Sequence, residues 1–319
     1  MLLLKRINYR KFLAIGLLVA MIFAISGCTK GKEGLVAKVD GEGITIEEFE
    51  SDFEVYKKIY EQRLGEGAMS EVGEDGKTLE ENLKNEIVQK LIMEKLVAKE
   101  ATKMDISVTD EEIEEQMSNY TTMMGGQEKF DEFLDNNKIS KEFFKENLRK
   151  EILFNKHRET FMAETNISEK EAQKYFNANK DDLVVIKASH ILVKTEEEGK
   201  KILERLNAGE KFDVLAKDLS IDKASAVNGG DLGYFTKGSM ISEFEEVAFN
   251  LKVGEISDLV KTEVGYHIIY LEDRKDTFET LKDDIMKLLK EQKYLKAVQD
   301  LRSSVKVKVY LDSKDSKKK

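Results

Sequence analysis

Apolar residues recur at helical spacing through most of the first half of the chain. The clearest stripe runs from Leu79 to Leu96 and is about one helix face wide, so it must pack against another element. At four predicted helix starts a Thr or Ser stands three positions before a glutamate, the pattern of a capping box. These pairs are Thr45 with Glu48, Thr78 with Glu81, Thr109 with Glu112, and Ser168 with Glu171. Residues 45 to about 180 are therefore predicted to be mainly helical, with loops at 65–77 and 123–126.

Strand-like runs stand before this helical region and after it. Residues 35–41 indicate a short strand that closes in a glycine turn. From residue 183 onward, apolar runs at 183–186 and 191–193 flank His190, and another run covers 264–271. Helical segments are predicted between these runs at 196–207 and 241–250.

Helical spacing returns after Arg274 and is followed by an alternating, strand-like segment. The helical stripe comprises Leu281, Ile285, Leu288, Leu289, Leu295 and Val298, and the alternating residues are Val305, Val307 and Tyr310. Because one helix cannot bury such a stripe alone, we expect the last helix and strand to pack back onto the first helices and strand. The predicted fold class is α+β, with a module at 183–274 inserted between two segments, 35–182 and 275–311, of a mainly helical domain.

The first 27 residues differ from the rest in composition. Four basic residues precede an apolar run at 12–25, which ends in two small residues before Cys28, the layout of a secretory signal over residues 1–27. The run is short for a membrane span, which needs about 20 apolar residues. Cys28 is the only cysteine, so no intrachain disulfide can form. A lone unpaired thiol at this position is the alternative to a modified one.

Charge narrows the choice of partners. The chain has 52 Lys and Arg against 62 Asp and Glu, and the four basic residues before Cys28 would leave with the signal, giving a formal charge of −14. This acidic balance argues against nucleic acid as a partner. After a polar tether at 28–34 the folded region begins, and residues 312–319 form a basic tail that we expect to be a solvated end.

Three strings carry unusual residues, and a fourth lies between the second and the third. They are Ala188-Ser189-His190-Ile191-Leu192-Val193-Lys194, Asn228-Gly229-Gly230-Asp231-Leu232-Gly233-Tyr234-Phe235, Gly265-Tyr266-His267-Ile268-Ile269, and the intervening Gly238-Ser239-Met240-Ile241-Ser242-Glu243-Phe244. Together they resemble the signature of parvulin-type peptidyl-prolyl cis/trans isomerases. With Ile25-Ser26-Gly27-Cys28, which resembles a bacterial lipobox, the whole chain is similar to PrsA-like foldase lipoproteins and, more distantly, to SurA-type chaperones.

This resemblance implies a fold, an activity and a location. The module would be a four-stranded antiparallel sheet with surrounding helices, and it would isomerise X-Pro bonds in unfolded or folding secreted proteins. Cys28 would be the lipid attachment site and would hold the mature protein at the extracytoplasmic face of the cell membrane, because two acyl chains anchor stably where one does not. The helical segments could equally form a homodimer or a crevice for client proteins.

The resemblance also implies a site. Rotation about an X-Pro bond breaks no covalent bond, so the reaction requires no nucleophile, cofactor or metal. Met240 and Phe244 would form the socket for the proline ring with Leu232 as its wall, and His190, His267, Asp222 and Thr262 would form the polar floor. The two histidines would share a hydrogen-bond chain. Some parvulins carry cysteine where Asp222 stands here, so this chain departs from that subgroup.

Several alternatives stay open from the sequence alone. Taken singly, each of these residues could be an ordinary core or structural residue, and a metal site from His190, His267 and Asp222 is conceivable by ligand type. The third histidine, His157, has charged neighbours and is predicted to lie on a solvated helix face. The chain could also be a holdase with a silent parvulin domain, or a surface adhesin that uses the anchor and the basic tail. Acidic residues at 196–198 disfavour a phosphorylated substrate.

Overall fold

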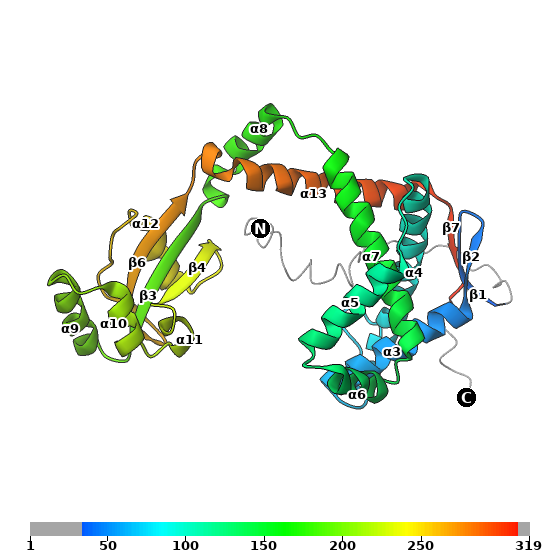
Figure 1. Ribbon diagram of the computed structural model, residues 1–319, viewed down its shortest axis with the longest axis horizontal. Helices are drawn as coiled ribbons and strands as arrows, with labels where there is room; N and C mark the ends of the chain where they lie inside the picture. The colour runs from blue at the N-terminus through cyan, green and yellow to red at the C-terminus, as the bar shows by residue number, and fades with distance from the viewer. Residues whose placement is uncertain (1–33, 312–319) are drawn as a thin grey trace. The chain divides into compact units, whose positions relative to one another are not determined.

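The computed structural model describes residues 34–311, which form two compact units. One unit, the α+β unit, spans residues 166–290, and the other, the helical unit, combines residues 34–165 with 291–311 (Figure 1). The chain thus leaves the helical unit and returns to it, which agrees with the predicted insertion. The α+β unit is longer at both ends than the predicted module at 183–274. The predicted signal, Cys28 and the basic tail lie outside the described residues.

The helical unit begins and ends in a small antiparallel sheet. Its strands are β1 Leu35–Val39, β2 Glu42–Thr45 and β7 Val307–Val309, in the order β2-β1-β7, with Ala37 opposite Val309 (Figure 1). The predicted pairing of the first and last strands is therefore confirmed. Strand β2 was missed, because its sequence of Glu-Gly-Ile-Thr has a single large apolar residue, Ile44, to mark it.

The first three helices of this unit begin where their caps predicted, and two more follow whose starts were not predicted. They are α3 Ile46–Leu64, α4 Leu79–Lys103, α5 Asp110–Met123, α6 Gln127–Asn137 and α7 Lys141–Glu164. Thr45, Thr78 and Thr109 each form a complete capping box. Residues 65–78 connect α3 to α4 with one short 3₁₀ turn, Ala68–Ser70. Met123 is the last residue of α5 rather than part of the following loop, and its side chain is 83% exposed.

Two apolar clusters hold the helical unit together. The α4 stripe is buried as predicted, with Leu83, Ile87 and Ile92 at most 1% exposed against the small sheet and α3. A second cluster, centred on Phe130, joins α5, α6 and α7. Burial of each of these side chains stabilises the fold by about 1.5–3 kcal/mol.

His157 is buried, so its prediction as a solvated residue is wrong. It is 4% exposed, and its Nδ1 lies 3.1 Å from the Tyr294 hydroxyl. Tyr294 belongs to α13, Phe278–Ser304, and its ring packs against Phe154 and Phe161 of α7. Burial lowers the pKa of His157 below its ordinary value of 6.5. The local sequence around His157 is charged, and only packing against α13 removes this side chain from water.

The buried stripe of α13 also differs from the predicted one. Leu281, Ile285, Leu288 and Leu289 are buried, but Leu295 is 37% exposed and Tyr294 takes the buried position in the helical unit. A helix turns by about 100° per residue, so the adjacent residue points away from the core. The prediction of Leu295 as a core residue is therefore wrong.

Replacing Tyr294 by phenylalanine should destabilise the helical unit by about 1–3 kcal/mol, because a buried ring nitrogen of His157 loses its partner. Chemical denaturation followed by circular dichroism measures this. Leu295→Ala, on the next and exposed position of the same helix, is the control and should change stability by less than about 0.5 kcal/mol. Equal effects of the two substitutions would contradict the assignment.

The α+β unit is built on a four-stranded antiparallel sheet in the order β4-β3-β6-β5. The strands are β3 Val185–Val193, β4 Asp231–Thr236, β5 Val260–Thr262 and β6 Gly265–Lys275. The two predicted apolar runs around His190 form one strand. The helices are α8 Glu169–Asn179, α9 Glu196–Asn207, α10 Phe212–Leu219, α11 Lys223–Ala226, α12 Ser242–Asn250 and the first part of α13. Lys180–Asp182 adds a 3₁₀ turn.

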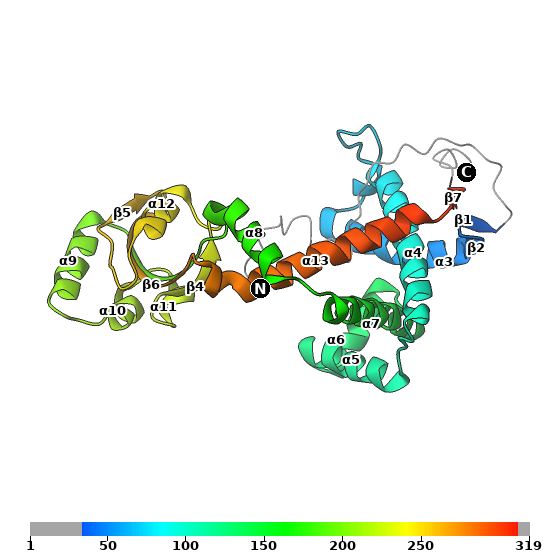
Figure 2. The ribbon, with the colours of Figure 1, turned by 90° about the horizontal axis from the view of Figure 1, so that it is seen from above.

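Helices cover both faces of this sheet (Figure 2). Helix α12 packs on the face that carries Ile186, Ala188 and Ile269, whereas α9 and α10 pack on the face that carries Ile191 and Ile268. Side chains on a strand alternate between faces, so His190 of β3 lies on the α12 face. By the same alternation His267 of β6, two residues before Ile269, lies on this face as well.

Candidate active site

The two histidines face each other because of the register of β3 and β6. His190 pairs with Ile269 and Leu192 pairs with His267, so the histidines are diagonal neighbours on one face of the sheet. Their ring centroids lie 5.3 Å apart with planes inclined by 25°, and the two Nδ1 atoms are 3.1 Å apart. Both residues are buried, at 6% and 4% exposure.

Asp222 and Thr262 complete the polar group at its two ends. The Asp222 Oδ2 atom lies 2.8 Å from His190 Nε2, and Thr262 Oγ1 lies 2.9 Å from His267 Nε2. Asp222 is the N-cap residue of α11, and Thr262 ends β5. The four predicted polar residues are thus brought into one chain of hydrogen bonds, which we call the polar chain, in the order Asp222, His190, His267, Thr262.

The loop that carries Asp222 is fixed to β3 by two hydrogen bonds. The Ile221 amide donates to the Leu192 carbonyl at 2.8 Å, and the Leu192 amide donates to Ser220 Oγ at 3.2 Å. Ser220 is fully buried. These bonds explain how a residue outside the sheet is held against a histidine inside it.

The hydrogen bonds of the polar chain all donate in the same direction. A carboxylate can only accept, so His190 Nε2 carries a hydrogen toward Asp222. When His190 is neutral, its Nδ1 accepts from His267 Nδ1, and the Thr262 hydroxyl then donates to His267 Nε2. The Val264 amide donates in turn to Thr262 Oγ1 at 3.3 Å. Every donor along the chain therefore points toward Asp222.

Burial and hydrogen bonding set the charges of this site. The pKa of His267 is lowered from 6.5 to about 4, first by burial and then by the neighbouring His190. The pKa of Asp222 is lowered, first by the hydrogen bond from Ser225 and then by that with His190. At pH 7 the site therefore combines a neutral His267 with an ionised Asp222.

Ser225 is a polar residue of this site that sequence reasoning missed. It is 6% exposed; its hydroxyl lies 2.6 Å from Asp222 Oδ2 and 3.1 Å from His190 Nε2. Its position three residues after Asp222, one turn along a short helix, was the available signal. In a hydrolytic triad the acid and the serine hold different nitrogens of the histidine, whereas here both contact Nε2. The Ser225 hydrogen points to the carboxylate, so the group is not arranged for nucleophilic attack.

Apolar side chains cover the polar chain. Phe244 of α12 is 2% exposed, and its ring stands nearly perpendicular to both imidazoles, 5.8 Å from His190 and 5.4 Å from His267. Leu232 of β4 and Met240, just before α12, are partly buried and pack on the same apolar cluster as Phe244. The structure therefore places the three predicted socket residues on the face of the sheet that carries the polar chain.

The glycine at 230 is required by the position of His190. It has φ of +87°, accepts a hydrogen bond from the His190 amide at 2.9 Å, and a Cβ there would lie 2.3 Å from the His190 carbonyl oxygen. We expect Gly230→Ala to cost at least about 2 kcal/mol and to displace His190 from the polar chain, because β3 must shift. Gly233→Ala, with φ of +67° and no atom within 4 Å of a Cβ, is the control and should cost only about 1–2 kcal/mol. Thermal unfolding and the histidine NMR signals of both variants test this.

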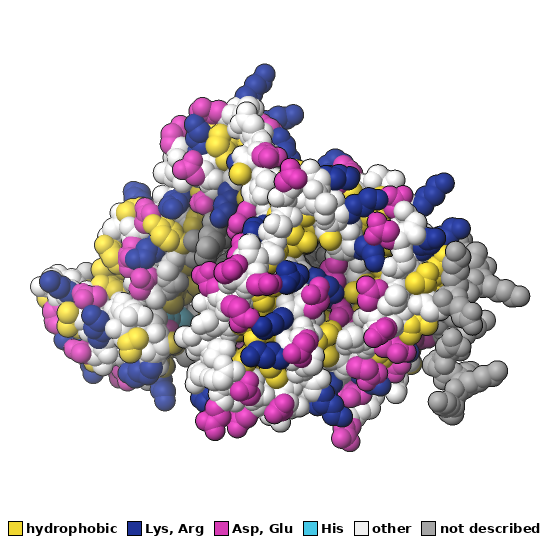
Figure 3. Space-filling view, turned by 45° about the vertical axis from the view of Figure 1, so that its right-hand side comes forward, with side chains coloured by type: hydrophobic (Ala, Val, Ile, Leu, Met, Phe, Trp, Pro, Cys, Tyr) yellow, Lys and Arg dark blue, Asp and Glu magenta, His cyan; other side chains and the backbone are white. Residues whose placement is uncertain are grey.

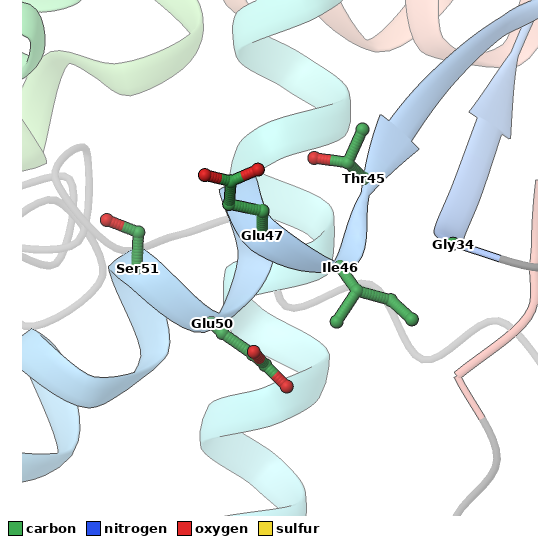
Figure 4. Close-up of a pocket in the computed structure, with 6 residues that line it drawn as sticks. All are labelled: Gly34, Thr45, Ile46, Glu47, Glu50 and Ser51. Atoms are coloured by element: carbon green, nitrogen blue, oxygen red, sulfur yellow. The ribbon is translucent and has the colours of Figure 1, made fainter.

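Residues 34–311 also contain a hollow in the helical unit. This hollow, of ≈ 690 Å³ at the start of α3, is lined by Gly34, Thr45, Ile46, Glu47, Glu50 and Ser51, none of which is a predicted site residue (Figure 4). Acidic and basic side chains are interspersed over the face shown in Figure 3. Within residues 34–311, no three His, Cys, Asp or Glu side chains are placed to hold a metal ion. None of the helices in the same residues has the length and apolarity needed to span a bilayer.

Two protein families match this chain, one in each part of the sequence. The PPIC-type PPIASE domain family matches residues 171–275, and the SurA-like N-terminal domain family matches residues 1–158. The foldase protein PrsA of Caldanaerobacter subterraneus subsp. tengcongensis is 36% identical over 92% of this chain and 98% of its own length. The foldase protein PrsA of Clostridium botulinum strain 657 is 31% identical, over 86% of this chain and 88% of its own length.

Two solved structures are also similar in sequence. PrsA from Bacillus subtilis is 29% identical and covers 77% of this chain and 96% of its own, with a TM-score of 0.34. NmPin, the parvulin of Nitrosopumilus maritimus, is 55% identical and covers 28% of this chain and 96% of its own, with a TM-score of 0.27. With the full-length relatives and both domain matches, the chain belongs to the PrsA foldase family and is a peptidyl-prolyl isomerase with a parvulin domain and a SurA-like helical region.

Proposed function

We propose that this foldase isomerises X-Pro bonds of secreted proteins, at a site made of the polar chain and the apolar socket, while Cys28 anchors it to the extracytoplasmic face of the cell membrane. The observation that carries the catalytic part is the unbroken series of hydrogen bonds from Asp222 to Thr262 beneath the ring of Phe244. A buried, preorganised polar group next to an apolar surface can stabilise an amide that is twisted about its C–N bond. No covalent bond is broken in this rotation.

The barrier to rotation about an amide is about 18–20 kcal/mol, and it comes from conjugation between nitrogen and carbonyl. A site lowers it by holding the twisted amide better than either planar form. Phe244, Met240 and Leu232 would hold the proline ring, and the polar chain would meet the carbonyl as it rotates out of conjugation. No covalent intermediate is involved, and each 1.4 kcal/mol of preferential binding gives about a tenfold rate increase.

Isomerisation of short X-Pro peptides by the chain from residue 29 onward tests the catalytic proposal. Line-shape or exchange NMR measures the rate without a coupled protease. We expect catalysis of peptides with unmodified residues before proline and weaker catalysis of phosphoserine-proline peptides, because Glu196, Glu197 and Glu198 form the exposed first turn of α9. Rates at the uncatalysed level for every peptide would overturn the proposal.

The anchoring proposal rests on the sequence of residues 1–28 and on the family to which the chain belongs. A lipid-modified Cys28 should carry the expressed full-length protein into the detergent phase in a phase-partition experiment. Cys28→Ser should leave it in the aqueous phase or in the unprocessed form. Recovery of the wild-type protein in the aqueous phase would exclude the anchor.

A second function is favoured by the helical unit. This unit matches the SurA-like N-terminal domain family, so a role in holding unfolded chains without isomerisation is the second candidate. A full-length variant that has lost isomerase activity, yet prevents aggregation of an unfolded protein as well as the wild type does, would support a holdase role. Dimerisation through the helical unit stays a prediction.

A further inference from the structure

We propose that Ser225 is a positioning residue of the isomerase site, which fixes the Asp222 carboxylate on His190 and so sets the direction of every hydrogen bond in the polar chain. The inference rests on the proposed function of the polar chain and extends it to a residue outside the predicted site. Ser225 would act through Asp222 and His190, without touching the substrate.

The contacts of Ser225 are more specific than packing alone would require. Its hydroxyl is within hydrogen-bond distance of both partners, at 2.6 Å from Asp222 Oδ2 and 3.1 Å from His190 Nε2. The side chain of Asp222 is 28% exposed, whereas Ser225 is 6% exposed. The buried hydroxyl therefore holds the one member of the chain that could otherwise turn toward water.

A second bond fixes the other oxygen of the carboxylate. Asp222 Oδ1 accepts from the Ala224 amide at 3.2 Å, as the cap of α11. Helix α11 has four residues, Lys223–Ala226, so a cap alone gives little rigidity. The bond from Ser225 to Oδ2 is the one that faces His190, and it is also the largest cause of the lowered pKa of Asp222.

The position of the carboxylate determines the tautomer of both histidines. With Asp222 in place, neutral His190 carries its hydrogen on Nε2 and accepts at Nδ1, and His267 donates from Nδ1. If Asp222 turned away, His190 could carry its hydrogen on Nδ1, and His267 would have to accept there. The Thr262 hydroxyl would then donate to the Gly265 carbonyl, 3.3 Å away, instead of to His267.

The structure thus contains hydrogen-bond partners for both directions in which the side chains of the polar chain can donate. The direction in which His190 donates to Asp222 uses the shorter contact of Thr262, 2.9 Å to His267, and the reverse direction uses the longer one. Ser225 contacts only the Asp222 end. Its hydroxyl favours the direction that leaves the Asp222 carboxylate as the final acceptor.

Long-range ¹H–¹⁵N spectra of the chain from residue 29 onward, with labelled histidine and at pH 8, test this inference. The wild type should show His190 protonated on Nε2 and His267 protonated on Nδ1. In Ser225→Ala we expect a mixture of tautomers at both residues, a higher titration midpoint for the Asp222 carboxyl, and a tenfold or greater loss in kcat with little change in KM.

Ser257→Ala is the matched control, because Ser257 is a buried serine of the same unit whose hydroxyl donates to the Asp258 carbonyl and accepts from the Ile269 amide, outside both the polar chain and the Asp222 loop. It should lower stability and leave the histidine tautomers unchanged. Ser225→Thr, which keeps the hydroxyl, should restore the wild-type tautomers. If Ser225→Ala does not fold, Ser225→Cys, which keeps the volume but donates weakly, replaces it.

The outcomes separate the inference from the proposed function. Unchanged tautomers in a folded Ser225→Ala or Ser225→Cys protein would overturn the positioning role, whatever the activity. Changed tautomers in a chain whose wild type shows no isomerase activity would keep the positioning role and overturn the catalytic proposal. Changed tautomers with lost activity would support both.

Discussion

Met240→Ala should lower kcat/KM for X-Pro isomerisation by about tenfold to a hundredfold. Burial of a methionine side chain contributes about 1.5–3 kcal/mol, and each 1.4 kcal/mol is a factor of ten in rate. Met240 packs beside Phe244 and Leu232 at the edge of the apolar cluster and is only partly buried, so its truncation removes socket surface without emptying the core. Exchange NMR on proline peptides measures the rate.

A methionine elsewhere in the same unit supplies the control. Met286 of α13 is also partly buried and packs on a different apolar cluster, with Phe176 and Leu281. Met286→Ala should lower thermal stability to a similar degree and leave kcat/KM within about twofold of the wild type. A similar loss of activity in both variants would show that activity follows stability, and the assignment of Met240 to the socket would be wrong.

Acidification should destabilise the α+β unit through His267. The pKa of this residue is about 4 in the folded chain against 6.5 ordinarily, so the unfolded state takes up a proton first as pH falls. The contribution to stability is present above pH 6.5 and is lost progressively down to about pH 4. Since one pKa unit corresponds to about 1.4 kcal/mol, the loss from His267 is roughly 3 kcal/mol.

Hydrogen exchange of core amides of β3 and β6 reports the stability of this unit across that range. Carboxylates elsewhere also titrate in acid, so the informative quantity is the difference between the wild type and His267→Gln. The variant loses partners at every pH and should be less stable throughout, but its stability should depend less steeply on pH between 6.5 and 4. Parallel pH profiles for the two proteins would contradict a depressed pKa at His267.

Local signals were enough for much of the helical architecture. Thr45, Thr78 and Thr109 marked helix starts correctly, because a cap and its partner are three residues apart and need nothing else. Strands β2 and β5 were not located by the apolar pattern, because they are short and carry few large apolar residues. A short strand is stabilised mainly by the strands with which it pairs, and those strands lie elsewhere in the sequence.

Histidine shows the limit of local reasoning most clearly. His157 was misassigned because its partner, Tyr294, is 137 residues further along the chain. The sequence of its own helix therefore gives no sign that the side chain is buried. His190 and His267 were nominated through resemblance to a family, whereas the contact between them depends on the register of β3 and β6. That register shifts between Lys187 and Ala188, and a slip of one residue would turn a histidine to the other face.

The sequence by itself determined the α+β class, the insertion of one module in another, the starts of several helices and, through resemblance to a family, the candidate residues of the site. Those properties follow from hydrophobic periodicity, helix caps and recurrent sequence strings. Each of these signals depends only on residues that are close together in the sequence. Only the tertiary structure decided that Asp222, His190, His267 and Thr262 form one directed chain, that Ser225 belongs to it, and that His157 is buried. These depend on strand register, on a loop tied to β3 and on the packing of α13, and such contacts join residues that are distant in the sequence.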